Sequence, residues 1–240
     1  MKQLLNMDIF ESTQQIHDGA EKFNVSIFEP KESTCIVIFA AGRGGNPMRH
    51  LSLLQAVAKR GCLTIAPHFD MLMSAVPSTD ELKTRIQRLE LTLKWYSQMG
   101  RPVIGVGHSL GCVLLLALAG GEARTLSGHQ AVSNLKLTFD KLVLFAPPVA
   151  FFAYPDALKS IDTPIYLRTG NKDTITPPNQ VFLFKERLEK QTKVEFVLDE
   201  DAGHFSYMDE LPPNVEDIQP ERNVFLSNFV KDIVRSVTTS

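Results

Sequence analysis

The chain has 240 residues, and its 25 Lys and Arg nearly balance its 27 Asp and Glu, for a net charge of −2 at pH 7. Because it has no basic block and no basic stripe interleaved with aromatic residues, this balance argues against a nucleic-acid partner. No window approaches the length of a membrane span, and residues 1–8 lack the apolar stretch of a signal peptide. A hydrophobic content of 44% suffices for the core of one α/β domain spanning residues 1–240.

Strands and helices are predicted to alternate along the chain. Residues 1–20 are weakly patterned and supply at most a first edge strand. Alternating or continuous apolar runs predict strands at residues 23–28, 35–40, 63–66, 102–107, 142–145, 165–167 and 194–198. Helical spacing predicts helices that start near residues 51, 79, 113, 179 and 224. Gly61 is expected to end the first of these helices, and Ser78 or Thr79 to cap the second.

This order indicates an α/β fold with a doubly wound, mostly parallel sheet. Residues 120–140 are a polar connection, and we see no internal repeat, low-complexity tract or domain-sized linker. In such a sheet the ligand site lies at the carboxyl ends of the strands. Reactive side chains directly after the predicted strands are therefore the candidates for the site.

A sharp turn with a serine at its apex follows the strand predicted at residues 102–107. Gly107 and Gly111 flank Ser109 where strand and helix backbones approach closely, so that a Cβ at either glycine would clash. Ser109 must accept a strained backbone, with its Oγ above the start of the next helix. The N–H of Leu110 faces the same space, where negative charge is favoured.

Residues 107–111, Gly-His-Ser-Leu-Gly after a buried strand, resemble the nucleophile elbow of the α/β-hydrolase serine enzymes. The resemblance covers in outline residues 23–237, and its specific motifs lie in three loops. It implies an α/β-hydrolase fold with Ser109 as nucleophile. Asp173, in a Gly-x-x-Asp context, and His204, in a Gly-His-Phe context, follow later strands in the chain order expected for the acid and the base. A serine needs a base to take its proton, and the base needs a carboxylate to fix its tautomer.

The resemblance also implies an oxyanion hole. One donor is the backbone N–H of Leu110. The second is the backbone N–H of Arg43, in Ala41-Gly42-Arg43-Gly44-Gly45 after the strand at residues 35–40. Many relatives carry His-Gly-x-Gly-Gly there, so Ala41 replaces a histidine that shapes the loop. Each donor contributes about 3–4 kcal/mol to transition-state stabilisation.

Simpler interpretations exist for the acid and for Arg43. Asp173 alternatively caps the helix near Pro177. The rival carboxylates are Asp162, which precedes its strand, and Asp199 and Asp201, which lie too near His204 in sequence. The guanidinium of Arg43 either binds a substrate carboxylate or, more commonly for a loop arginine, is solvated.

The histidines also have alternatives. His204 could be a surface loop histidine, and His108 is a rival base. An adjacent residue in a tight turn points away from its neighbour's side chain, so we expect His108 to be structural or to line the pocket. The histidines without a motif, which we expect to be solvated, are His17, His50, His68 and His129.

Two other function classes remain open. Residues 105–111 imitate a glycine-rich dinucleotide loop, but the next strand ends in Phe145-Ala146-Pro147-Pro148 instead of the acidic residue that binds ribose hydroxyls. A non-catalytic α/β-hydrolase-like binding protein normally loses a member of the triad, and none is lost here. No cofactor or metal is expected, because no Cys/His pair shows ligand spacing.

Only nineteen residues separate Phe145 from the strand at residue 165, where many relatives insert a cap. We therefore expect an uncapped, open site for a small ester or thioester, with apolar walls from Met71, Met73, Phe151 and Phe205. The outline resembles small carboxylesterases, thioesterases and the dienelactone-hydrolase-like branch, which often has cysteine as its nucleophile. A serine nucleophile argues against the dehalogenase and epoxide hydrolase branches, which have aspartate.

The three cysteines, Cys35, Cys62 and Cys112, lie in or beside apolar runs. Their odd number and apolar context predict buried, reduced thiols and a cytoplasmic protein. The sequence does not indicate an oligomeric state.

Overall fold

An eight-stranded sheet forms the centre of the computed structural model, which describes residues 8–96, 100–125, 127–131, 133, 137–216 and 218–239. Most of residues 1–8, where we expect no signal peptide, lie outside this range. In sheet order the strands are β1 (Ile9–His17), β2 (Lys22–Pro30), β4 (Cys62–Pro67), β3 (Cys35–Ala40), β5 (Val103–His108), β8 (Lys141–Phe145), β9 (Ile165–Gly170) and β10 (Val194–Asp199). β2 is antiparallel to β1 and β4, and all other pairs are parallel. This confirms the predicted mostly parallel sheet.

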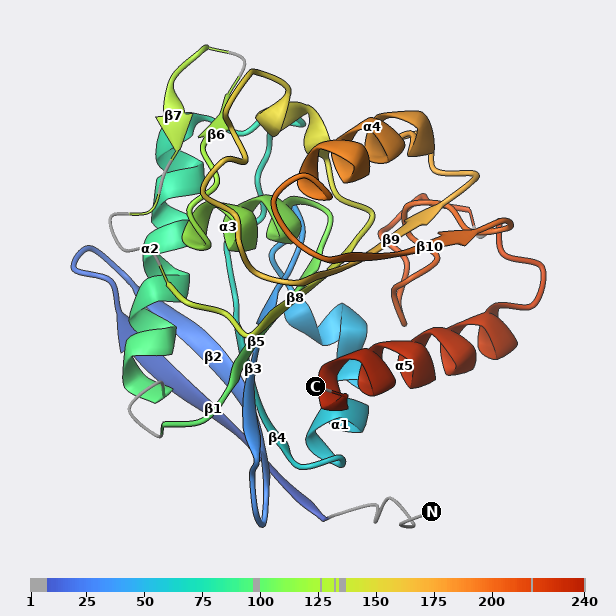
Figure 1. The fold of residues 1–240 in the computed structure, drawn as a ribbon. Coiled ribbons are helices and arrows are strands. Elements are labelled where there is room, and N and C mark those ends of the chain that lie inside the picture. The colour runs from blue at the N-terminus through green and yellow to red at the C-terminus, as the bar shows by residue number, and fades with distance from the viewer. Residues whose placement is uncertain are drawn as a thin grey trace.

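Helices cover both faces of this sheet (Figure 1). One layer contains α1 (Leu51–Ala58) and α5 (Arg222–Thr238), and the other contains α2 (Thr79–Tyr96), α3 (Leu110–Leu118) and α4 (Pro178–Leu188). Strands β3, β4 and β9 are buried along their whole length, as strands should be when both faces of the sheet are covered. All of α3 is buried as well, because it lies between the sheet and α2.

The helix signals in the sequence agree with the structure at several ends. Ser78 and Glu81 exchange hydrogen bonds, Ser78 N–H to the Glu81 carboxylate at 2.7 Å and Glu81 N–H to Ser78 Oγ at 3.2 Å, which is a capping box at the start of α2. Gly61 follows α1 with φ of +90°. α3 begins at Leu110, three residues earlier than predicted.

Two features were not predicted. They are the small sheet of β6 (Ala123–Arg124) and β7 (Gln130–Ala131) and the 3₁₀ helices Pro47–His50 and Val149–Phe152.

Cys35 and Cys62 form a disulfide, so the prediction of three reduced thiols is wrong for this pair. They are the first residues of β3 and β4 and face each other in the parallel register, with Cα atoms 4.7 Å apart. That separation is within the range that a disulfide spans. The sequence spacing did not reveal this alignment. Cys112 is a free buried thiol, as predicted. The disulfide removes the basis of the predicted cytoplasmic location.

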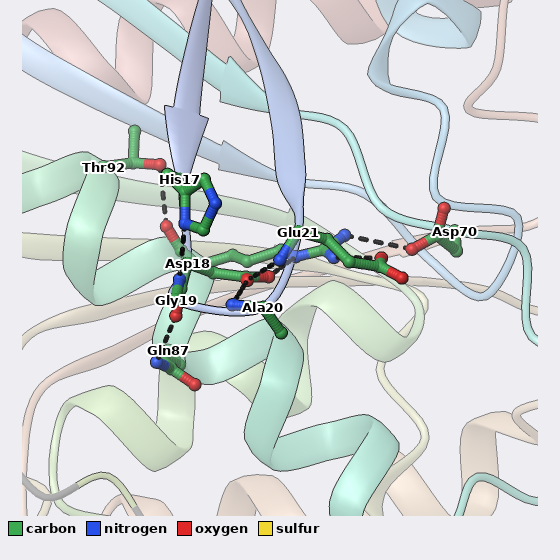
Figure 2. Close-up of polar contacts among 9 residues, drawn as sticks. His17, Asp18, Gly19, Ala20, Glu21, Asp70, Gln87 and Thr92 are labelled. Atoms are coloured by element: carbon green, nitrogen blue, oxygen red, sulfur yellow. Dashed lines mark hydrogen bonds and ion pairs between the residues drawn. The ribbon is translucent and has the colours of Figure 1, made fainter.

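Arg88 on α2 joins the β1–β2 hairpin to the helix layer. Its side chain is 5% exposed and pairs with Asp18 at 2.8 Å and Asp70 at 3.0 Å, with Glu21 at 3.4 Å. Figure 2 shows these carboxylates converging from the hairpin and from the loop after β4. A hydrogen bond from the Glu21 backbone, with the Arg88 contact, lowers the pKa of Asp18 to about 2 against the opposing effect of burial. The ion pair between Arg88 and Asp18 therefore holds the β1–β2 hairpin against α2.

Within the part of the chain that the structure describes, no helix is long and apolar enough to cross a membrane.

Candidate active site

Ser109 lies at the apex of the turn between β5 and α3. Its φ and ψ are 54° and −125°, a positive-φ conformation that costs energy for any residue other than glycine. A Cβ at Gly111 would lie 1.9 Å from the carbonyl oxygen of Ala40, at the end of β3, and one at Gly107 would lie 3.0 Å from the backbone nitrogen of Cys112. Both glycines are therefore required by close backbone approach, as the sequence predicted.

His204 reaches Ser109 from the loop after β10. Its Nε2 lies 2.8 Å from Ser109 Oγ, although 95 residues separate the two in sequence. Its Nδ1 lies 2.9 Å from Oδ2 of Asp173, from the loop after β9. An ionised carboxylate can only accept, so Nδ1 carries the proton and Nε2 is free to accept the hydrogen of the serine hydroxyl. The three residues form one continuous hydrogen-bonded chain at the carboxyl ends of β5, β9 and β10.

The Asp173 carboxylate is buried and fully hydrogen-bonded. Oδ1 accepts the backbone N–H groups of Ile175 and Thr176 at 2.9 and 2.7 Å, and Oδ2 accepts Thr176 Oγ1 at 2.6 Å. Burial acts to raise its pKa, but the hydrogen bonds from His204 and Thr176 outweigh burial, so its pKa is lowered and the group is ionised at neutral pH. Asp173 therefore forms a local turn with Ile175 and Thr176 but does not cap α4, whose N-cap residue Pro177 has no side-chain capping hydrogen bond.

Thr176 is a site residue that the sequence analysis missed. Besides donating to Asp173, its Oγ1 lies 3.2 Å from His204 Nδ1. The only available signal was the three-residue spacing from Asp173, which is typical of turn-forming pairs.

The rival carboxylates have other partners. Asp199 forms a bidentate ion pair with buried Arg168, at 2.6 and 2.7 Å, and also accepts the Tyr207 hydroxyl at 2.9 Å. Asp201 pairs with Lys172 at the surface, at 2.7 Å. Neither carboxylate contacts the His204 ring among the contacts of the described residues.

His108 is buried, and among the described residues its side chain contacts residues other than Ser109, as expected for a structural residue. Its Nε2–H donates to the backbone carbonyl of His204 at 3.0 Å, and its ring stacks on Phe145. Burial, and then the neighbouring His50, lower its pKa well below the usual value, so the ring is neutral. His108 therefore supports the loop that carries His204.

His50 is also buried, at 2% exposure, so its predicted solvation is wrong. Its Nδ1–H donates to the backbone carbonyl of Tyr207 at 3.1 Å, and its ring packs on Phe39 and His108. Burial lowers the pKa of His50 to about 3. Two neutral imidazoles therefore bind the carbonyls of His204 and Tyr207 in the same loop. The structure leaves His17 and His129 exposed, as predicted, and half-buries His68 beside Ser26.

These buried histidines should make folding sensitive to acid. A histidine in the unfolded chain takes up its proton near pH 6.5, whereas His50 resists protonation down to about pH 3. The free energy of unfolding should therefore fall as pH drops below about 6.5, by about 1.4 kcal/mol per pH unit for each such histidine. His50→Asn keeps a donor and loses the titration. The free energy of unfolding, measured with urea between pH 6 and 4.5, should fall less steeply with decreasing pH for this variant than for the wild type. An equal pH dependence of the two proteins would contradict the assignment of His50 as a buried neutral histidine.

The loop after β3 lies against Ser109. A Cβ on Gly42 would lie 3.1 Å from Ser109 Cβ and 3.6 Å from its Oγ. Among the described residues, neither the Arg43 N–H nor the Leu110 N–H has a hydrogen-bond acceptor. The Arg43 side chain is exposed, as expected for a solvated loop arginine, and its guanidinium also donates to the carbonyls of Leu72 and Met73 at 2.9 and 3.2 Å.

A cleft of about 200 Å³ opens beside His204. Its apolar lining comes from Ile175, Phe205, Leu211, Val215 and Ile218. Of the four predicted wall residues, Phe205 lines this cleft, with its ring edge-on to His204 at 5.1 Å. Met71 and Met73 are 61% and 85% exposed on the loop held by Arg43, and Phe151 packs against the core. The other lining residues were missed because they carry no motif.

No protein-family model and no curated protein matches the sequence. Many solved structures match the fold. The dienelactone hydrolase of Anabaena variabilis has a TM-score of 0.66 at 17% identity, over 95% of this chain and 96% of its own. A Xanthomonas campestris protein described as an α/β serine hydrolase without lid has a TM-score of 0.66 at 16% identity, over 96% of both chains. The Pyrococcus furiosus esterase has a TM-score of 0.64 at 16% identity, over 96% and 92%.

The chain has the α/β-hydrolase fold. Identities this low establish the fold alone, so the activity must be argued from the site.

Proposed function

We propose that this α/β-hydrolase-fold protein is a serine hydrolase that cleaves carboxylic esters or thioesters through an acyl-enzyme. The observation that carries the proposal is the hydrogen-bonded chain from Asp173 through His204 to Ser109. A nucleotide-binding protein would have no need of this alignment. In this proposal the chain is a single domain without a large cap, which the short connection between β8 and β9 supports.

Acylation begins with proton transfer from Ser109 Oγ to His204 Nε2 as Oγ attacks the substrate carbonyl carbon. Asp173 holds the ring and stabilises the imidazolium that forms. The carbonyl oxygen becomes an oxyanion, which the N–H groups of Leu110 and Arg43 stabilise. When the tetrahedral intermediate collapses, His204 returns the proton to the departing alcohol or thiol, leaving an ester on Ser109.

Deacylation repeats these steps with water. His204 removes a proton from the water as its oxygen attacks the acyl carbon, and the proton then returns to Ser109 Oγ as the acid leaves. The apolar cleft beside His204 accepts one of the two organic groups of the substrate.

A panel of p-nitrophenyl esters and acyl thioesters tests the proposal and its size preference. The rate should rise over the first few acyl carbons by at most about fourfold per methylene, equivalent to 0.8 kcal/mol, and then level off as the open cleft fills. Ile175→Ser, which alters a cleft residue 56% exposed, should flatten this rise. Val224→Ser, a control at equal exposure on α5, should leave it unchanged. No hydrolysis of any substrate would contradict the proposal, and a rate that climbs through long chains would contradict the size preference alone.

A further inference from the structure

The guanidinium of Arg85 binds the loop that carries the second proposed oxyanion donor. Arg85 lies on α2 and is 3% exposed. Its Nη1 donates to the carbonyl of Gly42 at 2.9 Å, and its Nη2 donates to the carbonyls of Arg43 at 2.8 Å and Asp70 at 2.5 Å. One buried side chain therefore holds three carbonyls from two loops.

The peptide bond between Gly42 and Arg43 connects Arg85 to the oxyanion hole. No peptide bond among the described residues is cis, the Gly42–Arg43 bond included, and in a trans peptide the C=O and N–H groups point in opposite directions. With the Gly42 carbonyl bound by Arg85, the Arg43 N–H of the same peptide is directed away from α2. Gly42 itself lies directly against Ser109. The contact with Arg85 thus sets the direction of a donor beside the nucleophile.

This loop needs such a constraint, because Gly42, Gly44 and Gly45 leave its backbone many accessible conformations. Other bonds tie the same segment to the loop after β4: Leu72 N–H donates to the Arg43 carbonyl at 3.2 Å, and Phe69 N–H to the Gly45 carbonyl at 3.0 Å. The Phe69 ring also covers the Arg85 guanidinium, with 5.0 Å from Cζ to the ring centroid. Burial lowers the pKa of Arg85 to about 10, so it remains charged at neutral pH.

We propose that Arg85 is a positioning residue, which orients the Arg43 N–H toward the oxyanion by holding the Gly42 and Arg43 carbonyls. This inference rests on the proposed hydrolase function. Arg85 itself does not touch the substrate. Its effect should therefore appear in the chemical step and not in substrate binding.

The alternative is that Arg85 only anchors α2, and Arg88 provides the matched control. Arg88 lies one helical turn later, is equally buried, and binds carboxylates of the hairpin and Asp70 without contacting the carbonyls of Gly42 or Arg43. If anchoring α2 is what matters, substitution of either arginine should have the same consequence.

The experiment compares Arg85→Ala, Arg85→Lys and Arg88→Ala in steady-state hydrolysis of a short p-nitrophenyl ester, per folded molecule. Arg85→Ala should lower kcat about 100-fold with KM within a few-fold, as expected for loss of one oxyanion donor. Added methylguanidinium should restore part of that kcat. Arg85→Lys keeps the charge but cannot bind three carbonyls at once, so its kcat should lie between those of the wild type and Arg85→Ala. It replaces Arg85→Ala in the comparison if the alanine variant does not fold. Arg88→Ala should keep its kcat and show no response to methylguanidinium.

Failure of the inference differs from failure of the proposed function. An active wild-type protein whose Arg85 variants keep full kcat, or whose Arg88→Ala variant loses as much, would overturn the positioning role alone. A wild-type protein that hydrolyses no ester or thioester would overturn both.

Discussion

Ser109→Ala should lower kcat for ester hydrolysis by about 10³- to 10⁶-fold, the range for loss of a serine nucleophile in such a triad. The substitution removes the Oγ that we propose to be acylated, which lies 2.8 Å from His204 Nε2. Stability should change little, because alanine meets the same strain at φ of 54° as serine. Steady-state kinetics on a p-nitrophenyl ester, with circular dichroism to verify folding, would measure both effects.

The matched control is Ser52→Ala. Ser52 is an exposed serine on α1 whose backbone N–H and hydroxyl both donate to Asp209, and it has no hydrogen bond to Ser109, His204 or Asp173 among the described residues. This variant should retain full activity. Residual activity of Ser109→Ala within tenfold of the wild type would contradict the assignment of the nucleophile.

Asp173→Asn should lower kcat by about 10⁴-fold. The asparagine would keep the size of the side chain, but its amide nitrogen would face Nδ1 of His204 and favour the tautomer with the proton on Nε2. That ring cannot accept the proton of Ser109. Measurement of kcat with a short ester, across the pH range in which the protein remains folded, would show a loss that no pH restores.

Asp201→Asn is the control for this change. Asp201 follows the neighbouring strand, but its side chain is 63% exposed and pairs only at the surface with Lys172, so we expect full activity. Asp199 is unsuitable because its loss would leave the Arg168 guanidinium, 5% exposed, without its bidentate partner and would destabilise the fold. A severe loss in Asp201→Asn together with a silent Asp173→Asn would reassign the acid.

The sequence was informative where local chemistry determines the structure. The central strands are continuous apolar runs, and the elbow needs glycine at Gly107 and Gly111 for close packing, so both could be predicted. Ser109, Asp173 and His204 follow three different strands of a parallel sheet, whose carboxyl ends share one edge. Their proximity therefore followed from the topology once the strand order was assumed.

Other features depend on contacts between distant segments and left no local pattern. The disulfide arises from the register of β3 and β4, and His50 is buried because a 3₁₀ helix carries it beneath the loop of His204. Arg85 looks like any polar residue on an amphipathic helix until the loop after β3 is placed above it. The cleft residues Ile175, Leu211, Val215 and Ile218 were also missed because they come close to His204 only in the folded chain.

The central claim, that Ser109 is an activated nucleophile, is tested most directly by a fluorophosphonate probe and peptide mapping of the adduct. Phosphonylation should occur once per chain, on the peptide that contains Ser109, and should be abolished in Ser109→Ala and strongly slowed in His204→Ala. An adduct on any other residue, or an active-site serine that does not react in the folded protein, would contradict it.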